Sequence, residues 1–215
     1  MLYFADYKGA DDALREAQRV LAACVGRPRG EDGRPRAHRL EVRCKAQIAE
    51  KSWQQGRFRE ADSMYAGAVS ELRASDMDAE RCVLVAELYE GHARVLDKLG
   101  AARSGMALAA EALAMRQRVP GYDARCLFRG YVLLAQLHMA LGGLREAQAA
   151  HETAAQILAR PPAGSAFEAS ELMVVGAELS VMRAAELGAA ERQIRDAMAL
   201  RAAHMGAGHP VLAQM

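Results

Sequence analysis

The segment Leu141-Gly142-Gly143-Leu144-Arg145-Glu146-Ala147 decides the fold, because its last residue opens a pair of small residues seven positions apart. The second member of the pair is Ala154, and a break marked by proline and glycine follows. The same spacing recurs at Ala61 and Ala68, at Gly105 and Ala112, and at Ala190 and Ala197. The steps between equivalent positions are 44, 42 and 43 residues, and a period of this length predicts stacked helical hairpins.

Each repeat is predicted to consist of two helices, and the second helix carries the small pair. In the first complete repeat, Gly56 marks the turn, and Ala61 and Ala68 follow it. Small side chains are needed where two antiparallel helices cross closely, because a larger side chain would push the axes apart and open voids. The small pairs therefore predict close helix crossings with large apolar side chains packed beside them.

The repeat resembles the tetratricopeptide repeat over nearly the whole chain. The length of the unit and the closing Gly206-Ala207-Gly208-His209-Pro210 are similar to the longer variety found in kinesin light chains. The resemblance implies an all-α, right-handed superhelical solenoid of helix-turn-helix repeats that binds other proteins. Two positions depart from the pattern in the last unit, since Ala185 replaces the turn glycine and Glu178 replaces a small residue.

We predict a single solenoid over residues 1–215. It consists of a partial unit at 1–25, an Arg/Gly/Pro-rich loop at 26–37, units at about 38–76, 77–121, 122–164 and 165–206, and the start of a further unit at 206–215. Helices are expected near 10–24, 38–55, 58–74, 78–99, 102–118, 123–141, 144–159, 166–185 and 189–205.

The prolines and one capping motif support these boundaries. All six prolines are predicted to fall between helices, where the missing N–H costs nothing: Pro28, Pro35, Pro120, Pro161, Pro162 and Pro210. Ser165 and Glu168 fit a capping box at the start of the helix 166–185. Neither end of the chain shows the polar face of a terminal repeat, so we expect a longer solenoid or a capping partner.

Composition argues against several classes of function. The 28 basic and 27 acidic residues nearly balance, which disfavours electrostatic binding to nucleic acid or to an anionic membrane. The sequence shows no secretory signal and no apolar run long enough to insert into a bilayer, so we expect a cytoplasmic protein, with a cytoskeletal or ciliary setting as one option.

Motifs that carry chemistry are absent from the sequence. It contains no Walker-type loop, no His-Glu-x-x-His and no nucleophile elbow. The four cysteines have no paired spacing, and we interpret them as small buried thiols rather than as disulfides or metal ligands. We therefore predict no catalytic residues, no metal site and no cofactor.

The segment from Gly26 to Arg36 is the one stretch of low complexity. Its four arginines would suit an acidic partner or RNA, but two carboxylates lie among them and no aromatic residue is interleaved. A solvated loop between repeats is the favoured interpretation.

The resemblance implies a concave groove lined by the first helix of each unit. Carrying the register over assigns to it Arg43, Ala46, Glu50, Trp53 and Gln54, then Glu87, Glu90, Arg94, Asp97 and Lys98, then Arg129, Val132, Gln136 and Met139, and finally Leu172, Val175, Leu179, Met182 and Arg183. The groove is thus expected to change from charged to apolar along its length. The chain contains no asparagine, so the ligand classes of the best-known grooves in this family are not transferred.

The helix expected at 166–185 is apolar nearly all round and should be covered on every side, by a further repeat or by a partner. Trp53, the one tryptophan, is predicted either to anchor a partner or to pack on the first loop. The sequence thus favours a non-enzymatic scaffold or adaptor in a larger protein assembly, such as a cytoskeletal or axonemal one. The alternative is a peptide-sensing regulatory module of a multidomain protein.

Overall fold

The structure of the chain is a computed structural model. It describes Glu16, Arg19 and the ranges 34–73, 79–119, 124–160, 165–183 and 187–205. Apart from those two residues and the last part of the loop, the predicted partial unit 1–25 and loop 26–37 lie outside the described residues. The further unit expected at 206–215 also lies outside them.

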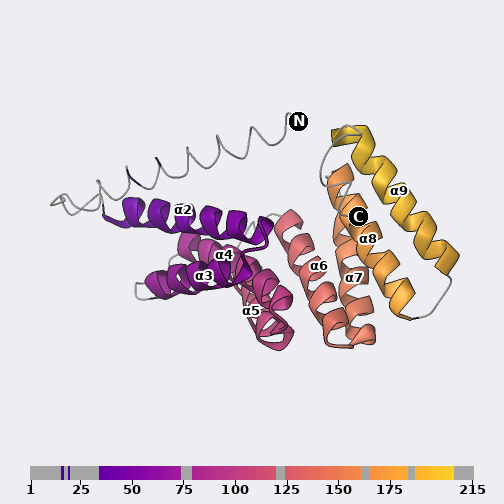
Figure 1. The fold of residues 1–215 in the computed structure, drawn as a ribbon, viewed down its shortest axis with the longest axis horizontal. Helices are drawn as coiled ribbons and strands as arrows, with labels where there is room; N and C mark the ends of the chain where they lie inside the picture. Colours follow the sequence, from indigo (N-terminus) through magenta and orange to yellow (C-terminus); the bar gives the residue numbers. More distant parts are fainter. Residues whose placement is uncertain are drawn as a thin grey trace.

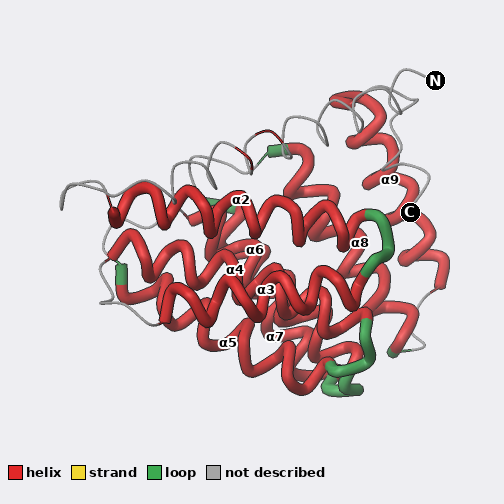
Figure 2. The backbone as a smooth tube through the Cα atoms, turned by 60° about the vertical axis from the view of Figure 1, so that its left-hand side comes forward, coloured by secondary structure: helices red, strands yellow, loops and turns green. Residues whose placement is uncertain are grey.

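Helices make up the described ranges, which contain no strand (Figure 2). Their bounds are α2 Arg34–Gln54, α3 Phe58–Arg73, α4 Ala79–Lys98, α5 Ala102–Arg118, α6 Ala124–Ala140, α7 Leu144–Leu158, α8 Ala166–Met182 and α9 Leu187–Met205. Most predicted bounds agree to within two residues. The largest differences are the start of α2, which begins at Arg34 inside the predicted loop, and the end of α8, which stops at Met182.

The helices pair as successive antiparallel hairpins along the molecule (Figure 1). Within each hairpin, α2 packs on α3, α4 on α5, α6 on α7 and α8 on α9. The first helices of successive hairpins also contact one another, α2 with α4, α4 with α6 and α6 with α8. This arrangement is a helical repeat solenoid, as predicted, and it gathers the first helices along one side.

The small pairs lie where the helices cross. Every member of the four pairs is buried, with Ala61, Ala112, Ala147, Ala154 and Ala197 all at 0% exposure. A Cβ added to Gly105 would lie 2.9 Å from the carbonyl oxygen of Ala93 on the facing helix. These positions are small because the neighbouring backbone occupies the space that a larger side chain would need.

Glycines close the turn inside three of the hairpins. Gly56, Gly100 and Gly142 have φ values of 74°, 78° and 77°, which are left-handed conformations that glycine adopts without strain. Position 185, where the fourth unit has alanine instead of glycine, lies outside the described residues.

The predicted helix start at Ser165 is confirmed. The Ser165 side chain accepts a hydrogen bond from the Glu168 amide, and the Glu168 carboxylate accepts one from the Ser165 amide at 2.7 Å. The expectation that every proline lies between helices is wrong for Pro35, which falls in the first turn of α2. That turn has no intrahelical acceptor for its N–H groups, so a proline is tolerated there.

Candidate functional site

Two adjoining hollows lie on the side formed by the first helices. One has a volume of about 530 Å³ and is lined mainly by α2, α4 and α6, and the other has about 670 Å³ and extends to α8 and α9. They share four lining residues, Arg94, Leu133, Gln136 and Glu171, so we treat them as one continuous groove. This groove is the candidate functional site.

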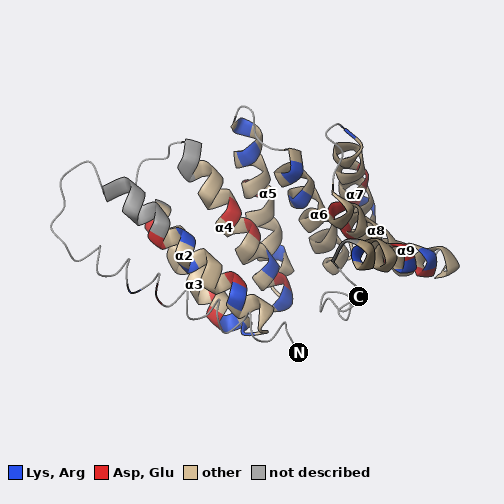
Figure 3. Cartoon of the chain, turned by 90° about the horizontal axis from the view of Figure 1, so that it is seen from above, with Lys and Arg blue, Asp and Glu red and all other residues tan. Residues whose placement is uncertain are grey.

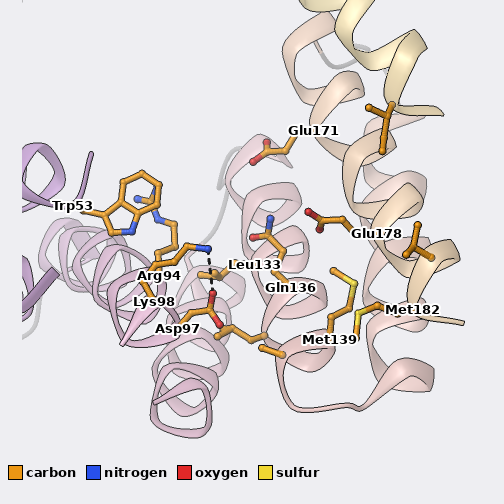
Figure 4. A pocket seen from close by; sticks show the side chains of 14 residues that line it. Trp53, Arg94, Asp97, Lys98, Leu133, Gln136, Met139, Glu171, Glu178 and Met182 are labelled. Carbon is orange, nitrogen blue, oxygen red and sulfur yellow. Dashed lines mark ion pairs between the residues drawn. The ribbon is translucent and has the colours of Figure 1, made fainter. Parts of the chain in front are cut away.

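Side chains line the larger hollow on two opposite sides, with a further side chain between them (Figure 4). Trp53 of α2 and Arg94 of α4 stand on one side, and Glu171 and Glu178 of α8 reach toward the space from the other. Gln136 of α6 lies between them. Side chains from four helices thus converge on a common space, which is the usual arrangement of a binding site.

Arg94 is fixed by two neighbours from the first repeat. Its guanidinium donates to a carboxylate oxygen of Glu50 at 2.9 Å and lies 5.3 Å from the centroid of the Trp53 ring. Glu50 also accepts a hydrogen bond from the Tyr65 hydroxyl at 3.2 Å. Burial, together with the negative charge of Glu50, raises the pKa of Tyr65, so this hydroxyl keeps its proton and remains a donor.

A buried ion pair underlies the charged half of the groove. Arg116 of α5 pairs with Glu90 of α4, and the two side chains are 3% and 13% exposed. Arg116 also donates to the carbonyl oxygen of Cys126 at 2.7 Å, which ties α5 to α6. Burial raises the pKa of Glu90 to about 7, even though Arg116 and Arg94 favour its charged form.

Two carboxylates face the groove from α8. Burial raises the pKa of Glu171, although Arg129, Arg201 and Arg94 favour its charged form. Glu178 is more exposed, and its partial desolvation raises its pKa in spite of Lys98. No hydrogen bond or ion pair joins Glu171 or Glu178 to any described residue.

The lining agrees with much of the assignment made from the sequence. Eleven of the fifteen proposed binding residues line the groove: Glu50, Trp53, Glu87, Glu90, Arg94, Asp97, Arg129, Val132, Gln136, Met139 and Met182. Arg43 is exposed on α2 outside the lining, and Leu172 packs on the core of α6 to α8. Whether these residues bind a partner stays a prediction.

The assignment is wrong for two residues of α8, Val175 and Leu179, which are only 1% and 2% exposed. They pack in the core against α6 and α7 and expose no apolar strip to the groove. The structure turns Glu171 and Glu178 to the groove instead. Since one residue corresponds to about 100° around a helix, the register was assigned roughly one residue too late.

The second helices also contribute to the groove, which the sequence assignment missed. Tyr65 of α3, Arg116 of α5 and Ile194 of α9 all line it. These side chains are large and follow or precede the small crossing residues in the sequence. Their size was the one signal that they could extend between the first helices into the groove. The lining of the groove was expected to change from charged to apolar along its length. This change is incomplete, because Glu171 and Glu178 place carboxylates on α8.

Side chains that could bind a metal ion do not cluster in the described ranges. Within them, no three histidine, cysteine or acidic side chains are placed to hold a metal ion. Cys44, Cys82 and Cys126 are free and half-buried, and Cys24 lies outside the described residues. Basic and acidic residues are interspersed over the helices (Figure 3), and none of the described helices is long and apolar enough to cross a membrane.

The fold defines the chain as a helical-repeat solenoid that is similar to tetratricopeptide repeats. A Rap protein complexed with Competence and Sporulation Factor superposes on it with a TM-score of 0.66 at 15% sequence identity. The match covers 86% of this chain and 47% of the Rap chain, so this chain spans about half of that protein. BtubC (BKLC) from P. vanneervenii gives a TM-score of 0.49 at 19% identity, covering 94% of this chain and 92% of that one. No family model and no curated protein matches the sequence.

Proposed function

We propose that this chain is a non-enzymatic protein-interaction module that binds an extended or helical segment of another protein in the groove. The observation that carries this proposal is the continuity of the groove across α2, α4, α6 and α8. A surface that runs across several parallel helices suits a segment of protein chain laid along it.

Two arginines of the groove are held by neighbouring residues before a partner arrives. Arg94 is held by Glu50 and Trp53, and Arg116 is held by Glu90 and the Cys126 carbonyl. Immobilising such side chains on binding normally costs conformational entropy, so groups that are already ordered favour affinity and define the register of the ligand.

The wider role that we propose is a scaffold or adaptor within a larger assembly, including a cytoskeletal or axonemal one. The repeat period of 42 to 44 residues supports a likeness between these repeats and the longer repeats of kinesin light chains. A second candidate is a peptide-sensing regulatory module, which is supported by the Rap structure because that protein is complexed with another factor.

A photo-crosslinking amino acid placed in the groove tests the interaction. Gln136 lines both halves of the groove and suits the probe, and Ala149, exposed on α7, provides the matched control position. The full chain carrying each probe is expressed in its source cells, irradiated and analysed by mass spectrometry. We expect the Gln136 probe to capture a peptide segment that the Ala149 probe does not.

Equal capture at Gln136 and Ala149, or capture at Ala149 alone, would refute the groove as the binding surface. The behaviour of the captured partner then separates the two roles. A partner that stays bound through high salt and size-exclusion chromatography supports the scaffold. A free peptide that exchanges within the chromatography supports the sensor.

A further inference from the structure

The groove contains more acidic than basic side chains. Its acidic lining residues are Glu50, Glu87, Glu90, Asp97, Glu171 and Glu178, and its basic ones are Arg94, Lys98, Arg116 and Arg129. Three of the basic residues already have a carboxylate beside them: Arg94 with Glu50 at 2.9 Å, Lys98 with Asp97 at 3.8 Å, and Arg116 with Glu90. The internal cations of the groove are therefore mostly neutralised.

The groove residues left without a close partner are unequal in charge. Glu87, Glu171 and Glu178 make no ion pair or hydrogen bond within the described part of the chain, and neither does Arg129. Arg129 acts on Glu171 only at longer range. Among the lining residues without a close partner, one cation thus stands against three carboxylates. Arg201 and Lys98 act on Glu171 and Glu178 only at longer range, so the lining keeps an excess of negative charge.

This negative charge is concentrated on one face of α8. Glu171 and Glu178 are seven residues apart, so they lie two helical turns and about 10 Å from each other along the same face. Both reach toward Gln136 (Figure 4). Beside them the lining becomes apolar, through Met139 and Met182.

Glu171 is half-buried and Glu178 is exposed, and no described cation lies close enough to pair with either of them. Partial desolvation disfavours their charged forms. A ligand that brings a cation supplies the missing partner through charge-assisted hydrogen bonds. A ligand that brings a carboxylate or a phosphate there meets like charge, which costs affinity.

We propose that the groove selects a protein segment in which a lysine or arginine stands next to an apolar residue. The basic side chain faces Glu171 and Glu178. The apolar side chain packs on Met139 and Met182. This inference rests on the proposed function and adds the chemistry of the partner. It excludes an acidic segment and nucleic acid as the occupant of the α8 side of the groove.

Selection from a random peptide library displayed on phage tests the preference, with the purified full chain as bait. We expect selected peptides to be enriched in lysine and arginine over aspartate and glutamate. The double variant Glu171→Lys with Glu178→Lys should invert this enrichment. A double variant with the same charge change on exposed sites of the second helices, Glu152→Lys with Glu191→Lys, should leave it unchanged.

A second measurement keeps the test independent of folding. Glu171→Gln with Glu178→Gln removes the two charges while retaining the shape. Neither carboxylate makes a hydrogen bond or an ion pair within the described ranges, so the fold should persist. We expect the variant to bind a selected arginine peptide about tenfold more weakly, the effect of losing one charged hydrogen bond. Affinity for the same peptide with citrulline in place of arginine should be unchanged.

The outcomes separate the two proposals. Selected peptides that compete with a Gln136 crosslink but lack basic residues would overturn the charge preference and leave the groove intact as a binding surface. An equal loss of affinity for the arginine and citrulline peptides would also overturn it. Selected peptides that never compete with the Gln136 crosslink would overturn the proposed function itself.

Discussion

Arg116 on α5 forms an ion pair with Glu90 on α4, and only 3% of the Arg116 side chain is exposed. The pair lies beneath the charged half of the groove and joins two helices of one hairpin. Removing one member of a buried pair leaves an uncompensated charge, which generally costs much more than the pair itself contributes.

We therefore expect Arg116→Met to lower the free energy of unfolding by roughly 3 to 5 kcal/mol at about pH 8. The raised pKa of Glu90 means that the folded state holds its proton more tightly than the unfolded state. The stability that protonation of Glu90 confers on the folded state is present below the unfolded pKa of 4.5 and is lost as the pH rises through about 7. Losing Arg116 raises the folded pKa further, so the damage should be smaller at about pH 5.

Urea titrations of Arg116→Met at both pH values measure this difference. Adding Glu90→Gln to the variant removes the ionisable group and should abolish the pH-dependent part of the loss. An equal loss at the two pH values would show that Arg116 acts only through packing and its hydrogen bond to the Cys126 carbonyl.

Two helical glycines should respond in opposite ways to the same substitution. A Cβ on Gly67 meets no atom within 4 Å, so Gly67→Ala should stabilise the chain by roughly 0.5 to 1 kcal/mol through helix propensity. A Cβ on Gly105 would lie 2.9 Å from the Ala93 carbonyl oxygen and 3.3 Å from a Leu137 methyl, so Gly105→Ala should destabilise it by roughly 1 to 3 kcal/mol. Thermal unfolding of the two variants side by side gives the signs, and shifts in the same direction would contradict the close crossing.

Two apolar residues near the end of α8 should differ in their tolerance of charge. Leu179 is 2% exposed in the core and Met182 is 48% exposed on the groove. Leu179→Asp should cost more than roughly 3 kcal/mol because it buries a carboxylate without a partner. Met182→Asp should change the free energy of unfolding by less than about 1 kcal/mol. Similar urea midpoints for the two variants would show that the orientation of α8 is wrong.

Binding of a basic peptide should weaken as the pH falls. The pKa values of Glu171 and Glu178 are raised, so the two side chains take up protons at higher pH than free glutamate and lose the charge that attracts the peptide. Of the groups around them, Arg129, Arg201 and Arg94 act on Glu171, Lys98 acts on Glu178, and these cations stay charged across the range. The Glu168 carboxylate also acts on Glu171 and raises its pKa. Fluorescence polarisation from about pH 8 to about pH 5 should show the decline. A citrulline peptide that declines equally would refute it.

The sequence was sufficient for the repeat, the crossings and most of the helix limits, because each of these has a local cause. A close crossing admits only a small residue, and the pairs such as Ala147 and Ala154 are fully buried. A left-handed turn favours glycine, as at Gly142, and a helix start favours a capping side chain, as at Ser165. Such preferences act within a few residues and can be read directly from the chain.

The groove face of α8 and the charge balance of the groove were decided by the tertiary structure. Apart from a narrow line of polar residues that includes Glu171 and Glu178, α8 is apolar nearly all round. Its pattern is therefore a weak guide to the outward face, and the expectation that Leu179 faces the groove is wrong because packing buries it. Pairs such as Glu50 with Arg94 join residues 44 positions apart, and no local pattern indicates them. Which carboxylates remain unpaired depends on all of these distant contacts together, since a side chain is neutralised only by the groups that the fold brings beside it.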